Sequence, residues 1–169
     1  MSPLGKLAEP GSPELYEDHG IKVYRVPQGN VHWYVSKIPA FGPLLTLVLR
    51  ELEYAWAAYR RIRTLHQQEP FDLIEGTETG SLLVALWLRR VPLVIRLHGE
   101  RYTFHKYCPE LSLTAELRLS RILQRAALRR ARILIAPSRT HAREINAELG
   151  AGSPPIEVIP NTLAFVNEP

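Results

Sequence analysis

Short apolar runs alternate with longer segments of helical periodicity along most of the chain. The runs are FDLIEG (71–76), PLVIRLHGE (92–100) and ARILIAPSR (131–139). The first two lack polar alternation, which is typical of strands buried on both faces of a parallel sheet. A shorter run, IEVIP (156–160), predicts a fourth strand.

Four helices are predicted between and beside these strands. The longest follows Pro43 and extends to about His66, because its apolar positions recur at spacings of four and three. The others are predicted over 80–89, 112–130 and 140–149, the last ending at Gly150, a common helix terminator. The regular alternation of helix and strand predicts an α/β, Rossmann-like parallel sheet with helices on both faces. The apolar face of the longest helix is formed by Val48, Leu52, Ala55, Tyr59 and Ile62.

The first forty residues show a less regular pattern. Residues 1–20 are rich in proline and glycine, which predicts an irregular segment. IKVYRV (21–26) alternates and predicts a strand that ends at Pro27, and residues 27–43 are predicted to be loop. We therefore expect one domain over 21–162, with an irregular segment before it and a short tail, 163–169, after it.

Polar and small residues follow each of the three main strands. They are Thr77-Glu78-Thr79, His98-Gly99-Glu100-Arg101 and Ser138-Arg139. Because ligands of open α/β sheets bind at the carboxyl ends of the strands, these residues are predicted to lie along one binding edge.

Each of these residues also has a structural interpretation. His98 either contacts a ligand, with Gly99 allowing close approach, or is satisfied by neighbouring backbone. Thr77, Thr79 and Ser138 suit helix N-caps as well as substrate binding. Glu78 is either an acid in the first turn of a helix or a hydrogen-bonding partner for sugar hydroxyls.

Composition and charge exclude several classes of protein. The chain has 169 residues and a net charge of +4, which is too weak a basic character to indicate nucleic-acid binding, and no nucleic-acid-binding module accompanies it. The single cysteine excludes an internal disulfide and a cysteine-built metal site. The beginning of the sequence does not resemble a secretory signal, so we expect a cytoplasmic protein.

One basic stripe suggests a partner surface. Arginines recur at spacings of three and four along the predicted helix over 112–130, and a solvated surface is their simplest interpretation. The alternative is contact with anionic lipid headgroups at the inner membrane face, helped by the apolar run LLTLVL (44–49). The stripe comprises Arg118, Arg121, Arg125, Arg129 and Arg132.

Common catalytic and cofactor motifs are not found. The sequence contains no phosphate loop, no glycine-rich dinucleotide fingerprint and no nucleophile elbow. No ligand cluster predicts a metal, and no bound cofactor is expected.

Five segments together resemble the N-terminal domain of the family-four retaining glycosyltransferases, which have the two-domain GT-B fold. They span nearly the whole chain from Ile21 to Thr162. The segments are GIKVYRVP (20–27), FDLIEGTETG (71–80), VPLVIRLHGE (91–100), RARILIAPSR (130–139) and IEVIPNT (156–162).

The resemblance implies a function for the predicted edge. In such enzymes the N-terminal domain holds the acceptor, and the C-terminal domain holds a nucleotide-sugar donor. His98 would then lie near the reacting sugar as the catalytic candidate, and the acceptor would be a saccharide or lipid-linked saccharide. The acceptor-binding candidates are Thr77, Glu78, Thr79, Gly99, Glu100, Arg101 and Ser138. The alternative function is a non-catalytic α/β module that engages a protein or membrane partner through the arginine stripe.

The same resemblance implies what this chain lacks. The family's first two strands precede the matching region, and its donor-binding domain follows it. We therefore expect a fragment truncated at both ends that is inactive alone. The strands at 71, 92, 132 and 156 should form one contiguous parallel sheet, with Ile21–Val26 outside it, either unpaired or abnormally paired. The strand at Phe71 would be an exposed edge and a site of self-association.

Overall fold

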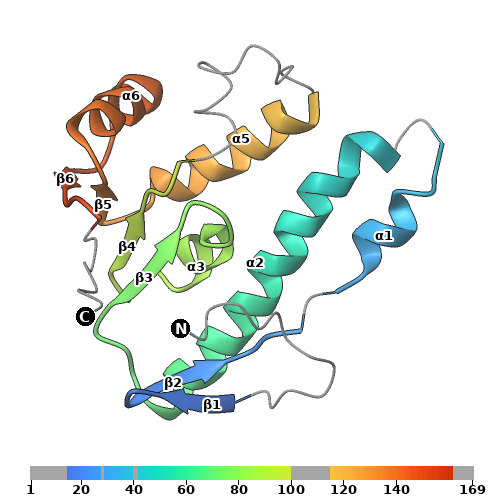
Figure 1. The fold of residues 1–169 in the computed structure, drawn as a ribbon, viewed down its shortest axis with the longest axis horizontal. Helices are drawn as coiled ribbons and strands as arrows, with labels where there is room; N and C mark the ends of the chain where they lie inside the picture. Colours follow the sequence, from blue (N-terminus) through green and yellow to red (C-terminus); the bar gives the residue numbers. More distant parts are fainter. Residues whose placement is uncertain (1–14, 28, 40–41, 100–114, 162–169) are drawn as a thin grey trace, which may run out of the picture.

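A computed structural model gives the fold of the protein and describes residues 15–27, 29–39, 42–99 and 115–161 (Figure 1). Two of the predicted site residues, Glu100 and Arg101, lie outside the described residues, as do residues 1–14 and the tail 163–169.

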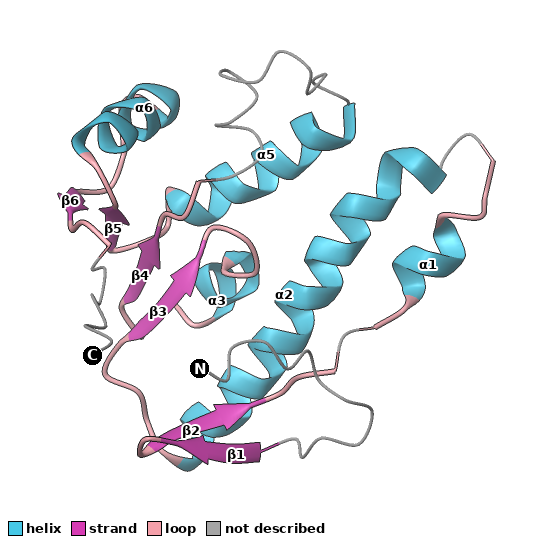
Figure 2. Ribbon diagram, viewed as in Figure 1, coloured by secondary structure: helices cyan, strands magenta, loops and turns pink. Residues whose placement is uncertain are grey.

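The larger of the two described sheets has four parallel strands and lies on one side of the molecule (Figure 2). Its strands are β3 (Ile74–Thr77), β4 (Leu93–Arg96), β5 (Ile133–Ala136) and β6 (Ile156–Val158), in that spatial order. Thr77 pairs with Arg96, which in turn pairs with Ile135, so the carboxyl ends of the first three strands are level. The predicted contiguous parallel sheet is confirmed.

Helices flank this sheet, as the sequence predicts. They are α2 (Gly42–Gln68), α3 (Leu82–Trp87), α5 (Ala115–Leu128) and α6 (Arg139–Leu149). Within the described residues, none of them is long and apolar enough to cross a membrane. Along α2, Val48, Ala55 and Tyr59 are buried, which confirms the predicted apolar face.

The core lies between these helices and one face of the sheet. Along β4 and the residue after it, Leu93, Ile95 and Leu97 belong to the core cluster, while Arg96 lies on the opposite face and pairs with Glu75 of β3. Leu134 and Ala136 of β5 continue the apolar layer, and both are fully buried. This alternation fixes the register, because a shift of one residue would place Arg96 in the core.

The structure corrects the prediction for FDLIEG. The strand begins at Ile74 rather than Phe71, and Glu75 and Thr77 are exposed, so β3 is not buried on both faces. Among the described strands β3 pairs only with β4. This confirms the prediction, made from the family resemblance, that it is an edge strand. Self-association through this edge stays a prediction.

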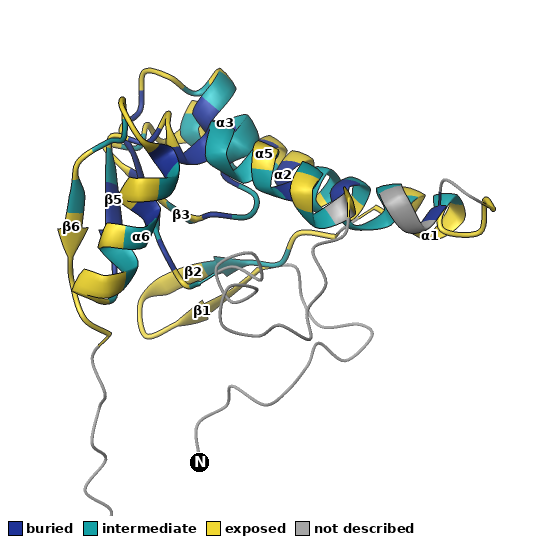
Figure 3. Cartoon of the chain, turned by 90° about the horizontal axis from the view of Figure 1, so that it is seen from above, coloured by how far each residue is buried: buried dark blue, intermediate teal, exposed yellow. Residues whose placement is uncertain are grey.

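Two elements near the N-terminus differ from the predictions. Residues 15–18, part of the segment predicted to be irregular, form strand β1 (Leu15–Asp18), which pairs with β2 (Ile21–Tyr24) as an antiparallel hairpin. The turn between them uses Gly20 at φ +81°, a conformation that glycine adopts without strain. The hairpin is a separate sheet whose residues are largely exposed (Figure 3), so the prediction that Ile21–Val26 would stay outside the parallel sheet is confirmed.

The segment predicted as loop over 27–43 contains a short helix, α1 (Val31–Val35). The prediction was wrong here because five residues are too few for a recognisable periodicity, and the helix forms against a neighbour. It lies along the beginning of α2 (Figure 1).

Candidate functional site

The three strand ends carry the predicted site residues along one edge of the sheet. Thr77 is the last residue of β3, His98 follows β4 by two residues, and Ser138 follows β5 by two residues. Because these strands are parallel and in register, all three residues lie at the carboxyl edge. The side chain of His98 is exposed rather than packed in the core, so it is available to a ligand.

Glu78 connects two of these loops. Its carboxylate is buried, with 5% of the residue exposed, and its Oε1 atom accepts hydrogen bonds from the backbone N–H groups of His98 (2.6 Å) and Gly99 (3.3 Å). Gly99 has φ +90°, which a residue with a side chain would adopt only with strain. The carboxylate and this glycine together define the path of the backbone that presents His98.

The loop after β3 is held by its own hydroxyl groups. Thr77 Oγ1 donates to the carbonyl oxygen of Thr79 (2.8 Å), and Ser81 Oγ donates to that of Thr77 (2.6 Å). The N-cap of α3 is Ser81, and its side chain makes no capping hydrogen bond. The N-cap interpretation of Thr77 and Thr79 is therefore wrong, because the chain makes a tight turn before the helix begins.

Gly80 is required in this turn for two reasons. Its φ is +92°, and a Cβ atom there would lie 2.4 Å from Cε1 of the Tyr54 ring. The ring of Tyr54, a residue of α2, therefore packs directly on the backbone of the loop that carries Glu78. This contact fixes the loop relative to the longest helix.

A small polar hollow lies behind the loop. It is bordered by Glu51 of α2, by Glu78 and by Gln124 of α5. Ser120, which is 3% exposed, donates its hydroxyl to both carboxylate oxygens of Glu51, at 2.7 and 2.8 Å. This bond satisfies a partly buried charge and joins α2 to α5.

Ser138 is the N-cap of α6, which confirms its structural interpretation. Its backbone is extended and its Oγ atom accepts the N–H of His141 at 3.2 Å. Ser138 is exposed, so its hydroxyl also faces solvent at the edge.

The Nε2 atom of His141 is shielded from solvent and has no hydrogen-bond partner within the described part of the chain.

His141 should make stability depend on pH. Burial lowers the pKa of its imidazole below the ordinary value of 6.5, and nearby Glu144 only partly opposes this. Below pH 6.5 His141 therefore binds a proton more readily in the unfolded chain than in the folded one. The contribution of His141 to the free energy of unfolding is highest above pH 6.5 and decreases as the pH falls below it. We expect the decrease in unfolding free energy from pH 7.5 to 5.0, measured with urea, to be smaller in His141→Gln. The control His19→Asn changes an exposed histidine and should retain the full decrease; an unchanged decrease in His141→Gln would contradict the prediction.

Three arginines of the predicted stripe bond to the end of α6. Arg121 pairs with the Glu148 carboxylate (Nε–Oε1 2.6 Å), Arg125 donates to the Glu148 carbonyl (2.8 Å), and Arg129 donates to the Leu149 carbonyl (2.7 Å). The last carbonyls of a helix lack intrahelical partners and favour cations. A structural role thus explains the spacing, while contact of the stripe with a membrane stays a prediction.

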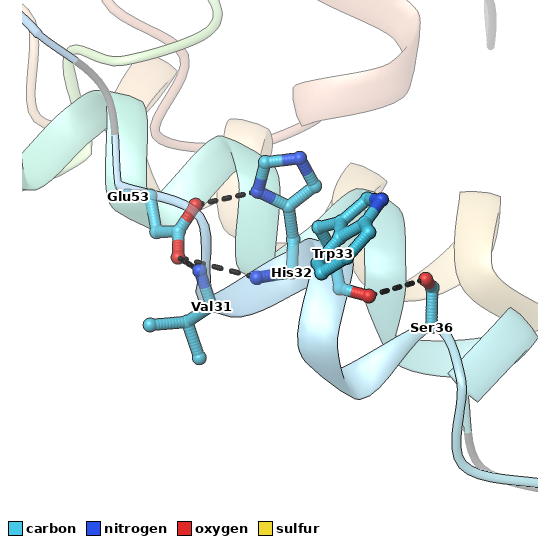
Figure 4. Close-up of polar contacts among 5 residues, drawn as sticks. All are labelled: Val31, His32, Trp33, Ser36 and Glu53. Carbon is cyan, nitrogen blue, oxygen red and sulfur yellow. Dashed lines mark hydrogen bonds and ion pairs between the residues drawn. The ribbon is translucent and has the colours of Figure 1, made fainter.

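A polar anchor far from the edge has no clear signal in the sequence (Figure 4). Glu53 of α2 accepts the backbone N–H groups of Val31 (2.6 Å) and His32 (3.2 Å) and contacts the ring Nδ1 of His32 (2.6 Å). Burial raises the pKa of the Glu53 carboxyl, but these hydrogen bonds outweigh it, and the pKa lies below its ordinary value. Glu53 and His32 fix α1 on α2. The two residues are 21 positions apart in the sequence, so no local pattern predicts their contact.

Titratable side chains do not gather into a metal site in the part of the chain that is described. No group of three His, Cys, Asp or Glu side chains has the arrangement needed to hold an ion there.

A comparison with known protein families agrees with the α/β fold. The chain belongs to the glycosyl transferase 4-like domain family, which it matches over residues 6–162. The match begins before Ile21, so it also includes most of the segment preceding the predicted domain. No curated protein and no solved structure gave a significant match. Membership supports a glycosyltransferase-like function in general.

Proposed function

We propose that this chain forms the acceptor-binding side of a retaining glycosyltransferase that uses a nucleotide-sugar donor. The observation that carries the proposal is the exposed His98, presented at the carboxyl edge of β4 by a loop fixed through Glu78. In the reaction, an acceptor hydroxyl oxygen forms the new glycosidic bond as the bond from the sugar to its diphosphate breaks. The proton of the hydroxyl passes to the departing diphosphate, and the anomeric configuration is retained.

The edge residues divide into two roles in this proposal. His98 contacts the reacting sugar, where a hydrogen bond from its ring stabilises charge that develops in the transition state. Glu78 is a positioning residue, because its carboxylate is occupied by the backbone amides of the His98 loop. Gly99 leaves room for the acceptor, and the hydroxyl groups of Thr77 and Ser138 border it.

The remaining acceptor contacts come from Thr79, Glu100 and Arg101. The acceptor is a saccharide or a lipid-linked saccharide, and the protein acts in the cytoplasm. The donor is a co-substrate bound mainly by a second domain, so this chain alone binds acceptor without turnover. The alternative, a binding module that uses the arginine stripe, is weakened because three of its five arginines bond to α6.

A saccharide-binding screen tests the proposal on the chain itself. Saturation-transfer NMR against a panel of oligosaccharides should detect ligands for the wild type and lose them in His98→Ala, whereas His19→Asn keeps them. Where the chain is joined to a donor-binding domain, NMR of the product should show the same anomeric configuration as the donor. Equal saccharide binding by His98→Ala, or an inverted product, would refute the corresponding part of the proposal.

A further inference from the structure

Two half-exposed tryptophans form an aromatic surface away from the proposed site. Trp56 of α2 is 48% exposed and Trp87, the last residue of α3, is 53% exposed. Their ring centroids are 6.1 Å apart, and the buried Tyr59 packs on both, at 5.9 and 4.9 Å. Because Tyr59 anchors the two rings, they form a fixed apolar surface, and such surfaces mark interaction sites.

Arginines surround the tryptophans. On α2, Arg60 and Arg63 follow Trp56 at spacings of four and seven, so they share its helix face, and both are exposed. Beyond α3, Arg89 and Arg90 follow Trp87 by two and three residues and are exposed as well. The surface is therefore aromatic at its centre and cationic around it.

A basic hollow extends this surface. It has a volume of about 780 Å³ and lies where the chain enters β4 and β5, and no acidic residue borders it in the described part of the molecule. The guanidinium groups of two of its arginines, Arg90 and Arg132, make no hydrogen bond or ion pair with the described residues. The basic residues that line it are Arg89, Arg90, Arg130 and Arg132.

The chemistry of this surface identifies its partner. A guanidinium group binds phosphate through two parallel hydrogen bonds, and indole rings settle at the level of lipid headgroups. A symmetric contact between two copies would bring the same arginines together, which like-charge repulsion disfavours. We propose that the Trp56–Trp87 surface and the adjoining hollow dock onto an anionic phospholipid bilayer.

The position of the surface makes this inference independent of the proposed function. The hollow lies at the amino ends of β4 and β5, whereas His98 lies beyond the carboxyl end of β4. Docking through the hollow therefore leaves the carboxyl edge open to an acceptor. Failure of saccharide binding would leave this inference intact, and failure of docking would leave the proposed function intact.

Vesicle binding tests the inference with the chain as it exists. The probes are vesicles of phosphatidylcholine alone and of phosphatidylcholine with phosphatidylglycerol. In a Trp33→Phe background, tryptophan emission reports only Trp56 and Trp87, and it should shift to shorter wavelength with the anionic vesicles alone. Replacing both Arg90 and Arg132 with Gln should lower partitioning in co-sedimentation by about 30-fold, since each surface arginine adds about a factor of five.

A matched control separates this surface from the part of the stripe that lies on α5, because Arg132 is the stripe residue that lines the hollow. Arg118→Gln with Arg143→Gln removes the same charge from exposed positions of α5 and α6 and should leave partitioning unchanged. A larger loss in this control than in the Arg90 and Arg132 variant would overturn the assignment. Equal binding to neutral vesicles, binding to neither, or binding of soluble glycerol phosphate without vesicle binding would also overturn it.

Discussion

Replacing His98 with alanine is expected to lower turnover by about 10²-fold or more once the chain is joined to a donor-binding domain. The side chain is exposed at the carboxyl edge and belongs to no hydrophobic cluster, so the substitution removes an interaction with the reacting sugar but little packing. Thermal unfolding should therefore be nearly unchanged while kcat falls. Steady-state kinetics and a melting curve of the same preparation measure both quantities.

The turnover and the melting temperature together distinguish a role of His98 in catalysis from a role in the stability of the fold. His19→Asn, an exposed histidine in the β1–β2 turn, is the matched control and should retain turnover. Near-normal turnover in His98→Ala would assign His98 to the scaffold. A large fall in melting temperature would show that the loss of turnover came from the fold rather than from the site.

Replacing Glu78 with alanine is expected to lower the unfolding free energy by about 3 kcal/mol, because it leaves the amides of His98 and Gly99 without their charged acceptor. Turnover should fall as well, because the loop that presents His98 loses its anchor. Glu78→Gln keeps a carbonyl oxygen in the same place and should recover part of both losses. Urea unfolding and kcat of the joined enzyme measure these effects.

Glu75 offers a matched control for Glu78, three residues earlier in the chain. Its side chain is 48% exposed and pairs with Arg96 at 2.7 Å on the face of the sheet opposite the core cluster. Exposed ion pairs contribute about 0–1 kcal/mol, so Glu75→Ala should cost little. Equal losses in the two variants would contradict a special role for Glu78.

Periodic segments of sufficient length were predictable from the sequence. Helix α2 is long enough to reveal its period, β4 lies within a continuous apolar run, and Gly150 ends α6 as predicted. Strand β1 and helix α1 were not predictable, because four or five residues carry no resolvable period. Both are held by partners: β1 by pairing with β2, and α1 by the carboxylate of Glu53.

The sequence by itself determined the order of strands and helices and which residues follow the strand ends, because hydrophobic periodicity and turn residues are local properties of the chain. Only the tertiary structure decided what each polar side chain contacts. Glu78 bonds to amides 20 and 21 residues away, and Arg121, Arg125 and Arg129 bond to the last two residues of α6. The physical reason is that a buried charged group must be hydrogen-bonded, and its donors come from segments that are distant in the sequence. The spacing of residues along one segment does not show which distant segments pack against it.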